Sequence, residues 1–143
     1  MSALVVKRAT GFLIYRQLPC DKIEFLLLQA SYKDHHWTPP KGHVDSGEDD
    51  ITTAYRETKE EAGFDKEDLI VKDFKVEMNY QAYGRPKIVI YFLAELKNPH
   101  QNVTLSEEHQ DSCWLSLDEA CHKVAYEDMQ ETLQKCYIYI KSS

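Results

Sequence analysis

The sequence has little of what would place a protein in a membrane or on a nucleic acid. Its 143 residues contain no apolar run near the length of about 18 residues that a transmembrane helix needs. The first ten residues, MSALVVKRAT, have neither a long apolar region nor a clear cleavage site, so we expect a strand there and no signal peptide. The formal net charge is -7, so basic residues are not in surplus. Because nucleic acids and acidic lipids are bound through basic surfaces, we expect neither as a partner.

Cysteine is also scarce. None of the four cysteines forms a C-x-x-C pair, which argues against a zinc cluster, and their density is far below that of a disulfide scaffold. We therefore expect reduced thiols and a cytoplasmic or nuclear location. The chain has no repeat or linker, and its length suits a single domain over residues 1–143 that acts as a monomer on a small molecule. The cysteines are Cys20, Cys113, Cys121 and Cys136.

The order of apolar segments predicts a mixed architecture. Residues 23–30, IEFLLLQA, form a continuous apolar run, which is typical of a strand buried on both faces. Pro39 and Pro40 exclude a helix from the loop 31–42, and Gly11 marks a bulge or bend in the first strand. The pattern predicts an α/β (α+β) fold in which helices sandwich a mixed β-sheet. The predicted strands are 4–16, 23–30, 69–82, 87–96 and 111–115, and the predicted helices are 47–63, 117–124 and 126–140.

The first predicted helix has clear start and stop signals. Ser46 is a good N-cap, Asp49 three residues later completes an approximate capping box, and Gly63 is a natural stop. Four residues recur at helical spacing and form its predicted core stripe, namely Ile51, Ala54, Thr58 and Ala62.

Three glutamates of this helix indicate a metal site. Glu57, Glu60 and Glu61 are spaced by three and four residues, so they share one face of the helix and repel one another. A divalent cation among them turns that repulsion into attraction, and Mg²⁺ or Mn²⁺ prefers such oxygen ligands. Arg56 can hold one carboxylate in place or contact phosphate. The alternative is an ordinary solvated helix, because short acidic clusters are common on exposed helices.

The complete segment is more specific. Residues 42–64, GHVDSGEDDITTAYRETKEEAGF, resemble the Nudix box, G-x5-E-x7-R-E-U-x-E-E-x-G-U, in which U is a bulky apolar residue. Thr58 departs from the first U position, and Phe64 fits the last. The resemblance implies a Nudix fold and the hydrolysis of a nucleoside diphosphate linked to another moiety. The fixed positions are occupied by Gly42, Glu48, Arg56, Glu57, Glu60, Glu61 and Gly63.

The resemblance also implies roles for these residues. Glu60 and Glu61 are expected to bind the metal, Glu57 to bind it or to orient the attacking water, and Arg56 to orient a glutamate electrostatically. Mg²⁺ is the expected cofactor, with Mn²⁺ as the alternative.

Further metal contacts are expected from residues other than these three glutamates. The Gly42 carbonyl is a candidate ligand, and Glu48 is a candidate for a second metal. Glu108, in the segment LSEEHQ, matches a family glutamate outside the box that completes the metal cluster. His109 stands next to it as a supporting residue. The alternative for this segment is a solvated acidic loop.

Segments outside the box resemble the branch of the family that cleaves dinucleoside polyphosphates. These segments are EFLLLQAS, HHWTPPKGH, KIVIYFLAEL and LSEEHQ. The resemblance implies asymmetric cleavage of diadenosine tetraphosphate to ATP and AMP. It also implies that Tyr80 and Tyr126 sandwich an adenine and that Lys87 holds phosphate.

The residues themselves suit a long, charged substrate with two ends. A tetraphosphate carries about four negative charges and needs cations, and a base needs flat partners. We expect His36 to contact the phosphate nearest the cleaved bond. The alternative for the tyrosines is packing at the edge of the sheet. Candidate cations are His36, Lys41, Arg85 and Lys87, and candidate rings are Tyr32, Tyr80, Tyr83 and Tyr126.

Two other functions stay open. The chain could act on another Nudix substrate, such as a modified nucleoside triphosphate or ADP-ribose. It could also be a nucleotide-binding Nudix module without activity, although loss of activity usually damages the carboxylates, and here they are all present.

Overall fold

A single mixed sheet runs through the centre of the structure. The computed structural model describes residues 6–32, 35–82 and 84–143, apart from the side chains of Tyr80 and Ala82. Its strands are β1 (Lys7–Leu18), β2 (Lys22–Ala30), β3 (Trp37–Thr38), β4 (Lys41–His43), β5 (Leu69–Ala82), β6 (Arg85–Leu96) and β7 (His109–Leu115). Its helices are α1 (Asp50–Ala62), α2 (Leu117–Lys123) and α3 (Glu127–Ser142), with a short 3₁₀ turn at Lys66–Asp68.

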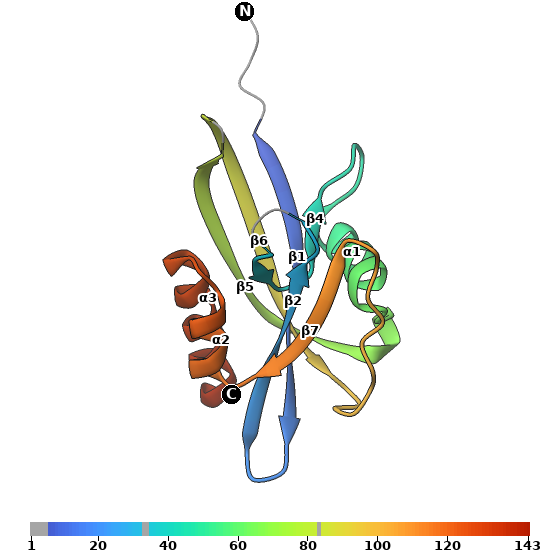
Figure 1. The fold of residues 1–143 in the computed structure, drawn as a ribbon, viewed down its shortest axis with the longest axis vertical. Coiled ribbons are helices and arrows are strands. Elements are labelled where there is room, and N and C mark those ends of the chain that lie inside the picture. The colour runs from blue at the N-terminus through green and yellow to red at the C-terminus, as the bar shows by residue number, and fades with distance from the viewer. Residues whose placement is uncertain (1–5, 33–34, 83) are drawn as a thin grey trace, which may run out of the picture.

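The sheet explains why the site draws on distant parts of the sequence. The main strand order is β3-β2-β1-β6-β5, with β4 paired to β1 and β7 paired to β2 (Figure 1). Strands β1 and β6 are parallel, and the other described pairs are antiparallel. The mixed sheet expected from the sequence is therefore confirmed. No helix in the described part of the chain is long and apolar enough to cross a membrane.

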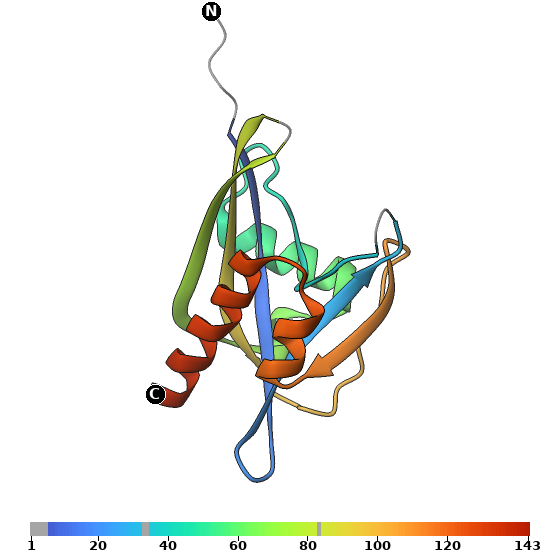
Figure 2. The same ribbon diagram turned by 60° about the vertical axis from the view of Figure 1, so that its left-hand side comes forward.

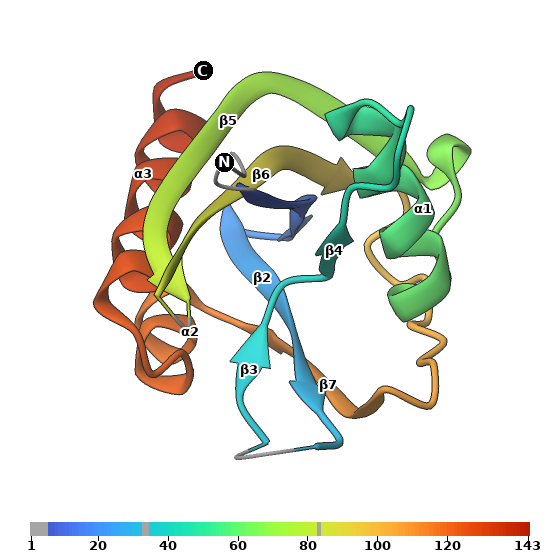
Figure 3. The ribbon, with the colours of Figure 1, turned by 90° about the horizontal axis from the view of Figure 1, so that it is seen from above.

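Helices cover the sheet on both sides. Helix α1 lies on one side, and α2 and α3 lie on the other (Figures 2 and 3). Strand β2 serves both layers, because Phe25 and Leu27 pack in the core under α2 and α3, whereas Leu26 and Leu28 pack in the core under α1. All four side chains have no exposed surface. The continuous apolar run therefore does mark a strand buried on both faces.

Helix α1 begins later than its sequence signals suggest. The N-cap is Asp49, whose carboxylate accepts a hydrogen bond from the Thr52 amide at 2.9 Å, so the prediction of Ser46 was wrong. The reason is Gly47, whose φ of 81° lies in the left-handed region that an α-helix cannot include. The predicted stop is confirmed, because Gly63 caps the helix with φ 79°.

The loop before α1 is more regular than predicted, because it contains the short strands β3 and β4. Gly11 marks no bulge or bend, since the pairing of β1 with β6 continues through it without a break. A side chain at Gly11 would collide with the carbonyl oxygen of Pro40. The glycine therefore allows the loop and β4 to approach β1 closely.

Candidate active site

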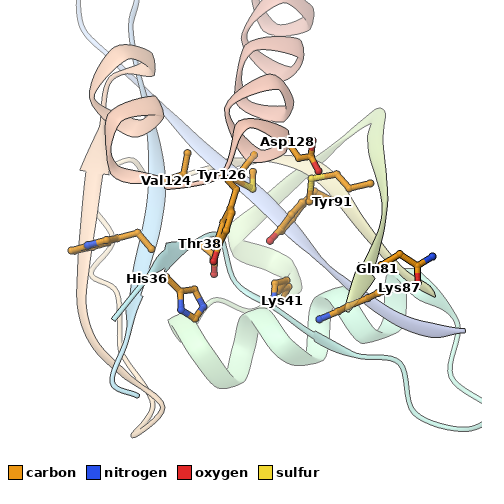
Figure 4. A pocket seen from close by; sticks show the side chains of 12 residues that line it. His36, Thr38, Lys41, Gln81, Lys87, Tyr91, Val124, Tyr126 and Asp128 are labelled. Atoms are coloured by element: carbon orange, nitrogen blue, oxygen red, sulfur yellow. The ribbon is translucent and has the colours of Figure 1, made fainter. Parts of the chain in front are cut away.

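Two adjoining cavities lie on the side of the sheet where the loop 35–43 crosses it. The larger, of about 430 Å³, is here called the aromatic cavity and contains Tyr126, Trp37 and Lys87 (Figure 4). The smaller, of about 280 Å³, is here called the carboxylate cavity and contains the predicted metal-binding glutamates. Both cavities are lined by the same three residues at their junction, His36, Thr38 and Lys41.

Two carboxylates meet inside the carboxylate cavity. Glu61 is 5% exposed and accepts a hydrogen bond from the Lys41 amide at 3.1 Å. The Glu57 carboxylate lies directly against Gly42, where a Cβ would overlap it. Burial, and then the negative charge of Glu57, raise the pKa of Glu61 well above the ordinary value. A buried carboxylate beside a second carboxylate needs a proton or a cation to be stable.

Arg56 connects the start of α1 with these carboxylates. Its Nε and Nη2 donate to the two oxygens of Glu48 at 2.9 and 3.0 Å, and its Nη1 donates to Glu57 at 2.9 Å. The Thr53 hydroxyl also donates to Glu48. Arg56 and then Thr53 lower the pKa of Glu48 to about 2. Both Glu48 oxygens thus accept hydrogen bonds, and Glu48 holds the Arg56 guanidinium in place, whereas a second metal on Glu48 stays a prediction.

The remaining metal candidates line the same cavity. Glu60 is exposed and lies 3.5 Å from Arg56 Nη1, and Glu108 is exposed in the loop before β7. His109 places Nε2 at 4.0 Å from Glu61 Oε1, and its buried Nδ1 has no hydrogen-bond partner among the described residues. Burial lowers the pKa of His109 and favours the neutral ring.

This donor set fits a hard divalent cation. Its charged members are carboxylates, and the buried Glu61 beside the half-buried Glu57 is the arrangement that such an ion stabilises. Within the described ranges, however, no three acidic, histidine or cysteine side chains already stand close enough to hold an ion. Glu57 and Glu61 would therefore anchor it, and the exposed Glu60 and Glu108 would move toward it.

The predicted cations divide between the two cavities and the surface. Lys41 is at the junction, and burial lowers its pKa although the charges of Glu61 and Glu57 oppose the shift. His36 also lies at the junction, and Lys87 reaches the aromatic cavity from β6 (Figure 4). Arg85 is exposed and lines neither cavity, so it is not brought to the site.

The predicted rings are likewise separated. Tyr126 precedes α3, lines the aromatic cavity and is 62% exposed. Tyr32 lines the carboxylate cavity and is 51% exposed. Tyr80 pairs with Lys87 in the β5–β6 ladder, but its side chain lies outside the described residues, as does the whole of Tyr83.

The sequence did not reveal the apolar wall of the aromatic cavity. Met78 on β5 and Met129 on α3 belong to this wall, together with Val124, and they join segments that only the tertiary fold brings together. Trp37 packs against the core, with the Lys123 ammonium 5.0 Å from its ring centre. It also lines the cavity. Strand alternation alone cannot show that such side chains face a ligand.

The site belongs to a known class of hydrolase. The model of the NUDIX domain matches residues 6–136, so the chain belongs to the Nudix family. Nudix hydrolases use divalent metal ions, in agreement with the carboxylate cavity.

Particular relatives match almost the whole chain. The asymmetrical bis(5'-nucleosyl)-tetraphosphatase of Sus scrofa is 51% identical over 141 residues, covering 94% of this chain and 96% of its own. The protein of the same name from Caenorhabditis elegans is 52% identical over 132 residues, covering 92% and 94%. The crystal structure of a C. elegans Ap4A hydrolase binary complex has a TM-score of 0.91, 49% identity and coverage of 96% of this chain and 99% of that chain.

Proposed function

We propose that the chain hydrolyses diadenosine tetraphosphate, and related dinucleoside polyphosphates, asymmetrically to ATP and AMP with Mg²⁺ as the metal. The observation that carries the proposal is the joining of an aromatic cavity to a carboxylate cavity through three shared residues, His36, Thr38 and Lys41. A ligand whose base lies in the aromatic cavity and whose reacting phosphate lies in the carboxylate cavity needs a polyphosphate chain between the two. The names of the full-length relatives support the same substrate.

The aromatic cavity would bind one adenosine. Tyr126 offers an exposed ring for stacking, and Tyr80 is proposed as its partner on the opposite side of the base. Lys87 and Lys41 would bind the phosphates that lead toward the carboxylates, and His36 would bind the phosphate nearest the cleaved bond. These contacts fix how many phosphates separate the bound base from the point of attack.

The carboxylate cavity would carry out the chemistry. Glu57 is proposed to take the proton of the attacking water, with Arg56 holding its carboxylate in place at 2.9 Å. Glu57, Glu60, Glu61, Glu108 and the Gly42 backbone would hold the metal. Bound Mg²⁺ would neutralise the phosphate oxygens and lower the pKa of water. Lys41 would add positive charge at the junction as charge develops on the phosphates.

The first experiment is a Mg²⁺-dependent assay on diadenosine tetraphosphate with identification of the products. In ¹⁸O-water we expect the label in AMP, because water attacks the phosphate that leaves with AMP. Label in ATP alone would contradict this point of attack. A higher kcat/KM on a modified nucleoside triphosphate or on ADP-ribose would overturn the proposed substrate.

We further propose that the chain works as a monomer in the cytoplasm or nucleus. All four cysteines are free thiols, which supports a reducing compartment.

A further inference from the structure

A dinucleoside substrate has a second base, and Tyr32 is placed to meet it. The ring of Tyr32 is 51% exposed although it lines the carboxylate cavity. It meets the His36 ring edge-on, with the ring centres 6.1 Å apart and the planes at 86°. Tyrosine combines a large flat surface with few rotatable bonds, so it binds a base at a small cost in entropy.

The main chain beside Tyr32 is fixed to the loop that carries Glu108. The Ser31 amide donates to the Glu108 carbonyl at 2.9 Å, and the Ser31 hydroxyl donates to the Glu107 carbonyl at 2.9 Å. The His35 amide donates to the Tyr32 carbonyl at 3.2 Å. The main chain at Ser31 and Tyr32 is thus held by hydrogen bonds, which lowers the entropy cost of placing the Tyr32 ring at the cavity.

Tyr126 and Tyr32, the exposed tyrosines among the described side chains, line different cavities. Tyr126 lines the aromatic cavity but not the carboxylate cavity, and Tyr32 lines the carboxylate cavity but not the aromatic cavity. His36 lines both and touches the Tyr32 ring. A dinucleotide whose first base stacks on Tyr126 and whose phosphates pass Lys41 and His36 therefore comes next to Tyr32 at the carboxylate cavity.

The charge around Tyr32 suits a base better than a phosphate. Glu107 is exposed on the neighbouring loop and is not among the proposed metal ligands, so its charge would repel a phosphate at Tyr32, whereas a neutral adenine is not repelled. We infer that Tyr32 is a second base-binding subsite, on which the adenine of the departing AMP stacks during cleavage. This inference rests on the proposed function.

The test compares substrates with two bases and with one base. Tyr32→Ala, Tyr32→Phe and Tyr126→Ala are assayed on diadenosine tetraphosphate and on adenosine 5'-tetraphosphate, which has only one adenosine. Tyr32→Ala is expected to lower kcat/KM about 5- to 150-fold on the dinucleotide, the range for loss of one base–aromatic stack, and less than about twofold on adenosine tetraphosphate. Tyr32→Phe keeps the flat ring and is expected to stay within about twofold on both.

Tyr126→Ala is the matched control, because loss of the first base subsite lowers kcat/KM on both substrates. Equal losses for Tyr32→Ala on the two substrates would mean that Tyr32 acts through His36, and would overturn the inference. No loss on the dinucleotide would overturn it as well. If the wild-type chain fails to produce ATP and AMP, the proposed function fails and the inference with it. If those products form but the losses are equal, only the inference fails.

Discussion

Replacing Gly42 with alanine tests whether the Glu57 carboxylate must stand where the structure places it. A Cβ built on Gly42 overlaps that carboxylate, whose three atoms are its nearest neighbours. Gly42 pairs with Thr10 in the sheet and does not have a left-handed φ, so alanine adds a collision without straining the backbone. The substitution therefore moves one catalytic group and leaves the charges of the site unchanged.

The size of the effect follows from the displacement. The carboxylate must retreat by at least about 1 Å to reach ordinary van der Waals separation from the new methyl group. That movement breaks the 2.9 Å hydrogen bond from Arg56 Nη1. Misplacing a reacting group by about 1 Å costs on the order of 100-fold in rate, or about 2.7 kcal/mol of activation free energy. We expect kcat to fall by about that factor, with KM changed less than about threefold because the base is bound elsewhere.

Steady-state kinetics on diadenosine tetraphosphate measure the loss of activity, and the melting temperature measures any loss of folding stability. Gly47→Ala is the matched control, because Gly47 has a φ of 81° and open space around its Cα. It should cost about 1 kcal/mol of folding stability from the left-handed conformation and leave kcat within about twofold. A Gly42→Ala chain that folds normally and keeps the wild-type kcat would refute the proposed role of Glu57.

Three further substitutions test the carboxylates and their support. Glu57→Gln should lower kcat by a factor of at least about 100 with a modest change in nucleotide binding, measured by kinetics and calorimetry; an unchanged rate would contradict its role as base. Thr58→Val should stabilise the fold by up to about 1 kcal/mol in urea unfolding, because the buried Thr58 hydroxyl has no partner among the described residues. Arg56 lowers the pKa of Glu48 from 4.5 to about 2, so this carboxylate adds stability above its unfolded pKa that is lost as pH falls toward 2. Glu48→Gln should remove that part of the acid dependence, and an identical pH profile would count against the pairing.

The sequence predicted the parts of the site that depend on local spacing. The positions of Glu57 and Glu61 on one helix face follow from the helical repeat, and Gly63 follows from the left-handed cap that ends the helix. The pairing of Glu48 with Arg56 did not follow from the spacing, because it depends on where the Arg56 side chain points once the loop before the helix has folded. The start of the helix was predicted too early for a similar reason, since the left-handed φ of Gly47 is not visible in the residues that flank it.

The aromatic cavity lay beyond sequence reasoning because it is assembled by strand order. Met78 and Lys87 come from the hairpin of β5 and β6, whereas Tyr126 and Met129 come from the start of α3. Their meeting depends on the parallel pairing of β6 with β1 and on α3 packing against β5, and no local pattern encodes either contact. Met78 falls in the predicted strand 69–82 and Met129 in the predicted helix 126–140, but neither prediction says which side chains face a ligand.

The surroundings of Glu61 depend on a residue that lies outside the Nudix box. Gly11 has no side chain, so the Pro40 carbonyl can approach β1, and β4 then pairs with β1 through Gly11 and Lys41. That pairing holds the Lys41 amide 3.1 Å from the Glu61 carboxylate. A side chain at residue 11 would push the loop outward and take the amide with it. The buried carboxylate would then lose its hydrogen bond and keep its repulsion from Glu57, so a strand outside the Nudix box decides whether the box can hold its metal.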